Sequence, residues 1–373
     1  MEKLLPFVIV VLILAYLSDY STKRLKQDTN YKDRFFFFIL LLCFFYFVGL
    51  RVAYNDTGNY INTYNSASDS INDIFKINYF LIGQYPGFSS VNIIMRSLGF
   101  TQYDFILAYS VFYLSVFFWF LRKYSKSFLF SVFLFITIGQ LGFSLAAIKQ
   151  CTAVAFCLIA TDAFLNKKKV KYVVFVLIAA LFHPYSLLYF ILPLLRFTPW
   201  SRKTYLFLAV FFVSGIALQT LLIGGIFDVA TMIGGKYSTD SFSGEGLSIF
   251  RVLIAWVPLV LSIFVRKEIG ELNDTKVKLF INLMMINAGI TFIALFGTAN
   301  YFVRLAYYFE IFQVLSLPYI LSLFDDKTRR ILTMFAIIGY SLYFVYSNAI
   351  STSFDLAYAR IKLSTFFSNR NIL

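Results

Sequence analysis

The chain has 373 residues, of which 60% are hydrophobic and only 14% are charged, and its formal net charge is +14. Soluble domains carry roughly 25% charged residues, whereas here long uncharged apolar runs recur along the whole sequence. This composition excludes a soluble enzyme and predicts an all-α, polytopic integral membrane protein. Because the positive charge is divided among linkers between apolar runs, it does not indicate nucleic-acid binding.

The apolar runs predict the membrane helices in chain order. The first run, Leu4 to Leu17, lacks a small-residue cleavage site and is predicted to be an uncleaved first span. Each run is long enough, or nearly long enough, to cross about 30 Å of hydrocarbon as a helix. The other expected helices are 35–50, 105–121, 128–145, 150–165, 204–223, 249–265, 279–297, 301–323 and 331–347.

The apolar stretch 172–195 is interrupted at its middle by His183-Pro184, where proline disfavours continuous helix. Positive charge decides how this stretch crosses the membrane, because Lys and Arg collect in cytoplasmic linkers. Six linkers hold 22 of the 33 Lys and Arg residues: 18–34, 122–127, 166–171, 196–203, 266–278 and 324–330. Two of these linkers flank 172–195, so the stretch is predicted to enter and return as two short helices that turn on the outer side.

This interpretation gives twelve helical membrane segments in a single transmembrane domain that covers residues 1–373. Two outer segments are too long for simple connections, and loops of more than about 12–15 residues are usually functional or disordered. Segment 51–104 contains apolar clusters and is predicted to be an outer-face loop with short interfacial helices. Segment 224–248 is rich in glycine and is predicted to be a second, mobile outer-face loop.

Five basic or potentially basic side chains are predicted to reach one depth near the outer face. They are Arg51, Lys149, His183, Arg251 and Arg304. Singly, such residues near helix ends often only extend to the lipid head groups. Ionisable groups within a membrane usually mark a functional site, and five of them at one depth favour binding of a phosphate or pyrophosphate.

His183 is the only histidine, and no suitably spaced cysteines accompany it, so no metal site is predicted. It is interpreted either as a hydrogen-bonded residue at a helix end or as a phosphate contact or proton-transfer group. Glu310 is the only acidic residue deep in a predicted span, where it either serves the site or balances a buried cation. Motifs for nucleotide binding or serine hydrolysis do not occur, and no cofactor is predicted.

Four short elements carry a resemblance to a known family. In chain order they are Gly49-Leu50-Arg51 with Asn55-Asp56 and Tyr60, then Ile148-Lys149-Gln150, then Ala179-Ala180-Leu181-Phe182-His183-Pro184-Tyr185-Ser186, and last Tyr301-Phe302-Val303-Arg304-Leu305-Ala306-Tyr307-Tyr308-Phe309. This ordered set resembles elements of the EpsG family, the Wzy-like polymerases of bacterial exopolysaccharides. Lys149 stands where that family has arginine, so the planar fork suited to bidentate phosphate contacts is missing there.

The resemblance implies a membrane glycosyltransferase of GT-C-like architecture in the bacterial cytoplasmic membrane. A growing glycan on undecaprenyl pyrophosphate would be the donor, and a second lipid-linked repeat unit would be the acceptor, joined at the outer face. The implied partners are these lipid-linked oligosaccharides and membrane lipids, together with a flippase and a chain-length regulator of the same pathway. No nucleic acid, cofactor or divalent metal is implied.

The implied site has three parts. Pyrophosphate would be held by Arg51, Lys149, Gln150, Arg251 and Arg304. Sugars would be contacted by Tyr60, Tyr64, Tyr307 and Tyr308, with Tyr85 as a further aromatic hydroxyl of the outer loop. An acceptor hydroxyl needs a general base, and Asp56 and His183 are both candidates.

Two other functions use similar residues. A transporter or flippase for an anionic lipid-linked saccharide would bind its cargo with the same cations, although the two matching halves found in many transporters are not detectable here. A membrane acyltransferase that modifies polysaccharides would also use an intramembrane histidine with arginines.

Overall fold

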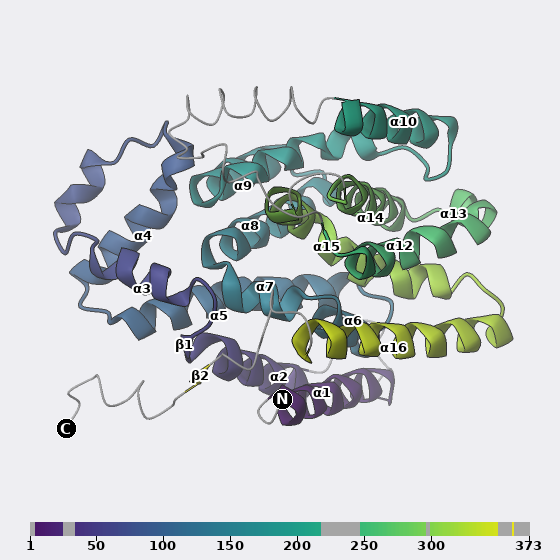
Figure 1. Ribbon diagram of the computed structural model, residues 1–373, viewed down its shortest axis with the longest axis horizontal. Coiled ribbons are helices and arrows are strands. Elements are labelled where there is room, and N and C mark those ends of the chain that lie inside the picture. The colour runs from purple at the N-terminus through teal and green to yellow at the C-terminus, as the bar shows by residue number, and fades with distance from the viewer. Residues whose placement is uncertain (1–3, 25–33, 218–246, 296–298, 350–359, 362–373) are drawn as a thin grey trace.

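The computed structural model describes residues 4–24, 34–217, 247–295, 299–349 and 360–361 (Figure 1). Its α-helices are α1 (Leu4–Arg24), α2 (Phe35–Phe44), α3 (Thr57–Asn65), α4 (Pro86–Ser97), α5 (Gln102–Tyr124), α6 (Phe128–Thr137), α7 (Gln140–Ala146), α8 (Ile148–Leu165), α9 (Lys169–Phe182), α10 (Arg202–Ala217), α12 (Ile249–Phe264), α13 (Arg266–Glu271), α14 (Thr275–Ile293), α15 (Ala299–Leu321) and α16 (Asp326–Ala349). A π-helix, η1 (Phe45–Gly49), and the 3-10 helices η2 (Ile71–Lys76), η3 (Ile82–Gln84) and η4 (Pro184–Leu195) complete the helical part. Strands β1 (Arg51–Ala53) and β2 (Arg360–Ile361) pair antiparallel.

Five helices in the described part of the chain are long and apolar enough to cross a membrane, namely α1, α5, α8, α14 and α16. The bent pair of α6 and α7 makes a sixth candidate, and shorter apolar helices accompany them at 35–49, 184–195 and 249–264. The chain is therefore an all-α, multi-pass membrane protein. The twelve membrane segments and the GT-C-like architecture expected from the sequence are not confirmed by this set.

The core lies around α14, which is 83% buried over its most apolar stretch, whereas α16 is 11% buried and α1 is 28% buried over theirs. Helices α5, α8 and α15 pack close to this centre, and their buried aromatic rings and aliphatic side chains belong to one continuous cluster. In a bilayer, apolar side chains of the peripheral helices can face lipid, so their exposure is expected rather than costly.

The expected single helix over 128–145 is divided into α6 and α7, which meet at an angle of 59°. The break occurs at Gly139, whose φ of +116° is a backbone conformation that side chains with a Cβ rarely adopt. All seven residues of α7 are buried. Protein therefore covers the backbone groups freed at the break, as the bilayer requires.

The expected break in 172–195 is present. Helix α9 ends at Phe182, His183 is extended, and η4 begins at Pro184. The two halves fold back on each other, since the Tyr172 hydroxyl donates a hydrogen bond of 2.6 Å to the backbone carbonyl of Tyr189. The second half is 3-10 rather than α-helical, and it contains a further proline inside it.

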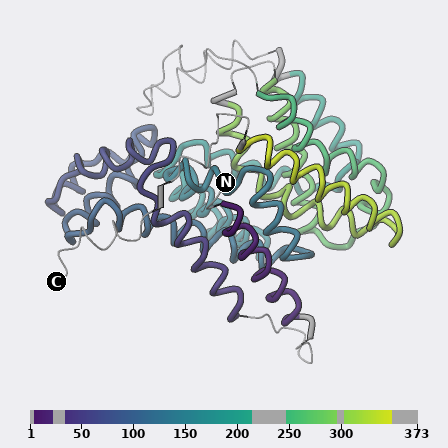
Figure 2. The backbone as a smooth tube through the Cα atoms, turned by 60° about the horizontal axis from the view of Figure 1, so that its bottom comes forward, coloured from purple at the N-terminus to yellow at the C-terminus, as the bar shows by residue number. Residues whose placement is uncertain are grey.

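Segment 51–104 forms β1, α3, η2, η3 and α4. Helices α3 and α4 lie at one end of the long axis of the molecule, while α13 and the turn between α15 and α16 lie at the other (Figure 1). Figure 2 shows from a second direction that α1 and α2 run side by side. The predicted mobile loop 224–248 lies almost wholly outside the described residues.

Candidate functional site

Lys149 lies inside a cage of three aromatic rings. Its ammonium nitrogen is 4.0 Å from the ring centre of Tyr85, 5.2 Å from that of Phe88 and 5.7 Å from that of Tyr60. All three rings come from segment 51–104, whereas Lys149 belongs to α8. Cation–π attraction of this kind is strongest where water is displaced, so the cage holds a positive charge at a defined place between the two segments.

The N-terminus of α8 adds to the positive potential at Lys149. Lys149 stands in the first turn, and the residue before the helix is Ala147, whose methyl group cannot cap backbone N–H groups. The partial positive charge of a helix N-terminus favours anions. The next residue, Gln150, donates a hydrogen bond from its side-chain amide to the backbone carbonyl of Arg304, which ties α8 to α15.

His183 is held by aromatic side chains on several sides and is only 4% exposed. Its Nδ1 is 3.0 Å from the hydroxyl of Tyr308. Its ring stacks on Tyr85 with centres 5.9 Å apart and meets the ring of Tyr185 edge-on at 4.7 Å. These contacts fix the orientation of the imidazole and leave Nε2 as its second polar atom.

Four charged or polar residues predicted from the sequence share this neighbourhood. The charges of Arg304 and Lys149 act on His183, and the charge of Asp56 acts on Lys149. Burial first, and then the charge of Asp56, raise the pKa of the Tyr60 hydroxyl, which therefore stays protonated. We call Asp56, Tyr60, Tyr85, Lys149, His183 and Arg304 the Lys149 cluster.

Arg51 is fully buried and takes part in local packing. Its Nη1 donates to the carbonyl of Val48 at 2.6 Å and to the hydroxyl of Ser110 at 3.3 Å. Its Nε donates to the hydroxyl of Thr57 at 3.2 Å, and Thr57 opens α3 directly after Asp56. Its Nη2 is buried without a hydrogen-bond partner among the described residues. Arg51 thus secures the turn that carries Asp56.

Arg251 belongs to a separate group. Its Nη2 is 3.7 Å from Oε1 of Glu310, and its guanidinium carbon is 4.8 Å from the ring centre of Tyr307. Gln140 donates a hydrogen bond of 2.7 Å to the other carboxylate oxygen of Glu310. We call these four residues the Arg251 cluster. The structure bears out the interpretation of Glu310 as the counter-charge of a buried cation.

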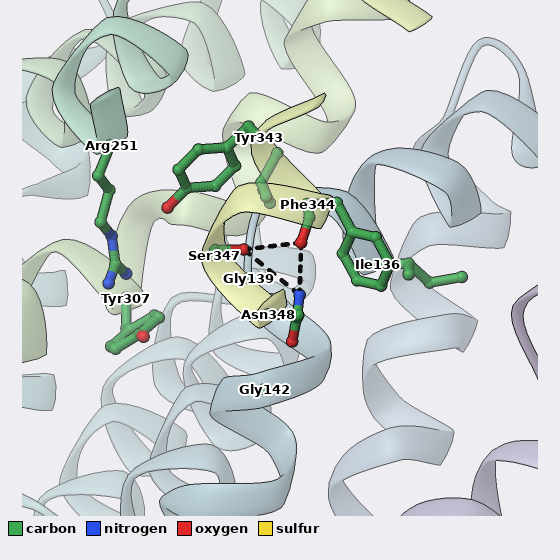
Figure 3. Close-up of a pocket in the computed structure, with 10 residues that line it drawn as sticks. Ile136, Gly139, Gly142, Arg251, Tyr307, Tyr343, Phe344, Ser347 and Asn348 are labelled. Carbon is green, nitrogen blue, oxygen red and sulfur yellow. Dashed lines mark hydrogen bonds between the residues drawn. The ribbon is translucent and has the colours of Figure 1, made fainter. Parts of the chain in front are cut away.

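Arg251 and Tyr307 of this cluster line a small cavity, whose other lining residues come from α6, α7, α16 and the break between α6 and α7 (Figure 3). The cavity has a volume of about 20 Å³ and is lined by Arg251, Tyr307, Tyr343, Ser347 and Asn348 among others. Figure 3 shows the Arg251 side chain extending toward the ring of Tyr307. About 10–15 Å³ suffices for one water molecule, so the space fits a water rather than a sugar.

Three of the four tyrosines expected to contact sugars are buried, namely Tyr64, Tyr307 and Tyr308. The Tyr64 hydroxyl donates to the carbonyl of Phe100 at 2.8 Å, and Tyr307 stacks on Phe143 at 4.0 Å. Their sugar contacts stay predictions that require these rings to move. Tyr60 is partly exposed and lies in the Lys149 cluster.

The sequence did not predict the aromatic cage. Nothing in the residue pattern marks Phe88, and the pattern indicates Tyr85 only as a sugar contact. The available signal is the turn Tyr85-Pro86-Gly87, which starts a helix with proline and places a small residue where close packing occurs. The cage residues lie between 61 and 89 positions before Lys149 in the chain, so no periodicity or spacing identifies them.

The described part of the chain is an all-α membrane protein in which the helices α8, α12 and α15 carry Lys149, Arg251 and Arg304. A family model, that of the EpsG family, matches residues 34–360, which is most of the chain. The chain therefore belongs to the EpsG family, and this membership suggests a polysaccharide polymerase, a membrane glycosyltransferase that acts on lipid-linked saccharides. No curated protein and no solved structure matches the chain.

Proposed function

We propose that this protein joins saccharide repeat units carried on undecaprenyl pyrophosphate at the outer face of the bacterial cytoplasmic membrane. The observation that carries the proposal is the convergence of Lys149, His183 and Arg304, since Tyr85 contacts both Lys149 and His183 and Gln150 donates to the carbonyl of Arg304. Asp56 joins them through the effect of its charge on Lys149. These residues come from four distant parts of the chain, and each belongs to one of the four elements that resemble the family. Residues that only extend singly to lipid head groups would have no reason to lie together in one cluster.

In the proposed reaction, a hydroxyl oxygen of the acceptor sugar attacks the anomeric carbon of the donor glycan. The bond between that carbon and the pyrophosphate oxygen breaks, and the lipid pyrophosphate leaves with the bonding electrons. Lys149, Arg304 and the N-terminus of α8 supply fixed positive charge for this leaving group. Gln150 holds the backbone of Arg304 against α8 and thereby keeps the two cations together.

The acceptor hydroxyl must lose its proton, and Asp56 suits that role better than His183. Asp56 stands on the partly exposed turn that opens α3, where an acceptor sugar can reach its carboxylate, and its charge acts on Lys149. His183 is buried, and Tyr308 occupies its Nδ1. We assign His183 the role of a hydrogen-bond donor to phosphate through Nε2.

The remaining predicted contacts enter the proposal with different roles. Tyr60 is the aromatic side chain best placed to meet a sugar at the cluster. Arg51 holds the turn that carries Asp56 by its hydrogen bond to Thr57. Arg251 is ion-paired to Glu310, so it reaches a phosphate only if that pair opens. A flippase and a chain-length regulator are the expected partners upstream and downstream.

Purified protein supplied with lipid-linked repeat units in detergent micelles should produce a ladder of glycans. A polymerase needs no second compartment, whereas a transporter leaves single units unchanged in micelles and moves them across proteoliposomes. Asp56→Asn should abolish the ladder because the base is lost, while Asp69→Asn, at an exposed position of the same segment, should leave it intact. A normal ladder from Asp56→Asn would remove that assignment, and unchanged single units with wild-type protein would remove the polymerase.

The proposed orientation is checked with single cysteines in a background that lacks the three native ones. Positions 76 and 168 are both exposed, in segment 51–104 and in the basic linker before α9 respectively. A membrane-impermeant thiol reagent added outside intact cells should label a cysteine at 76 and spare one at 168, because Lys and Arg collect in cytoplasmic linkers. The reverse pattern would place the Lys149 cluster on the cytoplasmic side.

A further inference from the structure

The turn that begins α4 carries Tyr85, whose ring contacts two polar residues of the Lys149 cluster. The ring of Tyr85 lies 4.0 Å from the Lys149 nitrogen and also stacks on His183 at 5.9 Å with an interplanar angle of 27°. One ring therefore touches a cation of α8 and the imidazole at the break between α9 and η4. No other ring of the cage has a ring contact with His183 among the described residues.

The backbone of Tyr85 is itself unusual. Its φ of +57° and ψ of +54° put it in the left-handed region, which is uncommon for residues other than glycine and particularly so for bulky ones. Such conformations persist where the surroundings over-determine them, and they gather at functional sites. Pro86 follows as the first residue of α4 and restricts the same turn further.

Close packing of α4 on α9 fixes the position of the Tyr85 turn. A Cβ added to Gly87 would lie 2.8 Å from Cβ of Leu181 and 3.2 Å from the backbone oxygen of Leu181. Only glycine permits this approach, because a contact under 3.0 Å forces the two helices apart. Leu181 is two residues before His183, so the contact that seats α4 lies directly beside the histidine that Tyr85 stacks on.

We propose that Tyr85 is a positioning residue, whose ring holds the Lys149 ammonium and the His183 ring at fixed places relative to each other. Because Tyr85 directly precedes α4, the packing of α4 on α9 determines where this ring lies. The inference rests on the proposed function, because the geometry matters for catalysis only if Lys149 and His183 contact the pyrophosphate. Tyr85 itself need not touch the reacting atoms. Its ring, rather than its hydroxyl, makes both of the contacts described.

The first test measures how fast the Lys149 amine reacts with acetic anhydride, and it does not depend on glycan formation. Purified full-length protein is treated with a trace of acetic anhydride at fixed pH, and acetylation of Lys149 is quantified by mass spectrometry against exposed Lys76. Tyr85→Leu removes the ring and should raise the relative reactivity of Lys149 about fivefold or more. Tyr85→Phe keeps the ring, and its Lys149 should react at close to the native rate. Unchanged reactivity in Tyr85→Leu would overturn the proposal.

The second test moves the turn without changing Tyr85. Gly87→Ala should displace α4 from α9, raise the reactivity of Lys149 in the same direction and lower kcat about tenfold or more with a smaller change in KM. Gly58→Ala is the matched control, because nothing lies within 4 Å of the Cβ it would add in the same outer segment. Equal reactivity and kcat in the two variants would contradict the seating argument, even if Tyr85→Leu did not fold.

The two tests distinguish failure of the positioning role from failure of the proposed polymerase reaction. If wild-type protein makes no glycan but Tyr85→Leu still exposes Lys149, the cage is real and the proposed reaction is wrong. If wild-type protein polymerises and Tyr85→Leu changes neither Lys149 reactivity nor kcat, the reaction stands and Tyr85 has no positioning role. Rescue of kcat in Tyr85→Phe relative to Tyr85→Leu separates ordering by the ring from loss of the hydroxyl.

Discussion

Replacing Lys149 or Arg304 by glutamine is expected to lower kcat by about 10²–10³, equivalent to roughly 2.7–4 kcal/mol of transition-state stabilisation. The reason is that the departing pyrophosphate loses a preorganised positive charge which water cannot replace inside the protein. Lys149→Arg keeps the charge and should retain more activity than Lys149→Gln. The rate of glycan formation from purified lipid-linked units measures the effect.

Lys76→Gln is the matched control for these two variants. Lys76 lies in the same outer segment, its side chain is 78% exposed, and its partner is Asp73 at 2.6 Å. Exposed ion pairs of this kind contribute little to stability because water screens both charges, so stability and rate should stay near wild type. If Lys149→Gln and Arg304→Gln behaved like Lys76→Gln, the cationic site would have no catalytic role.

Arg251→Gln is expected to reduce the free energy of unfolding, by about 3 kcal/mol at the lower end of the usual range for breaking a buried ion pair. The change leaves the carboxylate of Glu310 buried with Gln140 as its remaining side-chain hydrogen-bond donor. The lower end is appropriate because the two charged groups are 3.7 Å apart rather than in direct bidentate contact. Thermal unfolding in detergent measures the loss.

The double variant Arg251→Gln with Glu310→Gln should recover most of that stability, since no unpaired charge then remains buried. Lys149→Gln should cost far less stability than Arg251→Gln, because no acidic side chain forms an ion pair with Lys149 in the described part of the chain. An Arg251→Gln protein that loses activity while unfolding at the wild-type temperature would instead make Arg251 a direct substrate contact, as the sequence first suggested.

The break between α9 and η4 could be predicted from the sequence, because proline disfavours the helical conformation of the residue before it and His183-Pro184 interrupts an otherwise apolar run. The positions of most helices could be predicted for a related reason, since hydrophobicity along the chain reports where an apolar helix begins and ends. The common depth expected for Arg51, Lys149, His183, Arg251 and Arg304 stays a prediction.

Rotation about the helix axes was not predictable in the same way. Arg251 and Arg51 were both expected to hold pyrophosphate together with Lys149. In the structure Arg251 faces Glu310 and Tyr307, and Arg51 donates hydrogen bonds to Val48 and Ser110. Membrane helices are apolar around most of their circumference, so their amphipathic pattern gives little information on which face meets which neighbour. The bend at Gly139 was missed because one glycine among 18 does not identify a break.

The length of α9 has a consequence for how a substrate reaches the site. Its 14 residues span roughly 21 Å, against about 30 Å for the hydrocarbon core. In the proposed orientation, with the lysines at 167–169 at the cytoplasmic boundary, the His183 turn would lie inside the outer leaflet, short of the outer edge of the hydrocarbon core. A pyrophosphate anchored by its own lipid tail would meet this recess sideways from the acyl-chain layer, so diffusion in the plane of the membrane, rather than through water, would set the rate of delivery.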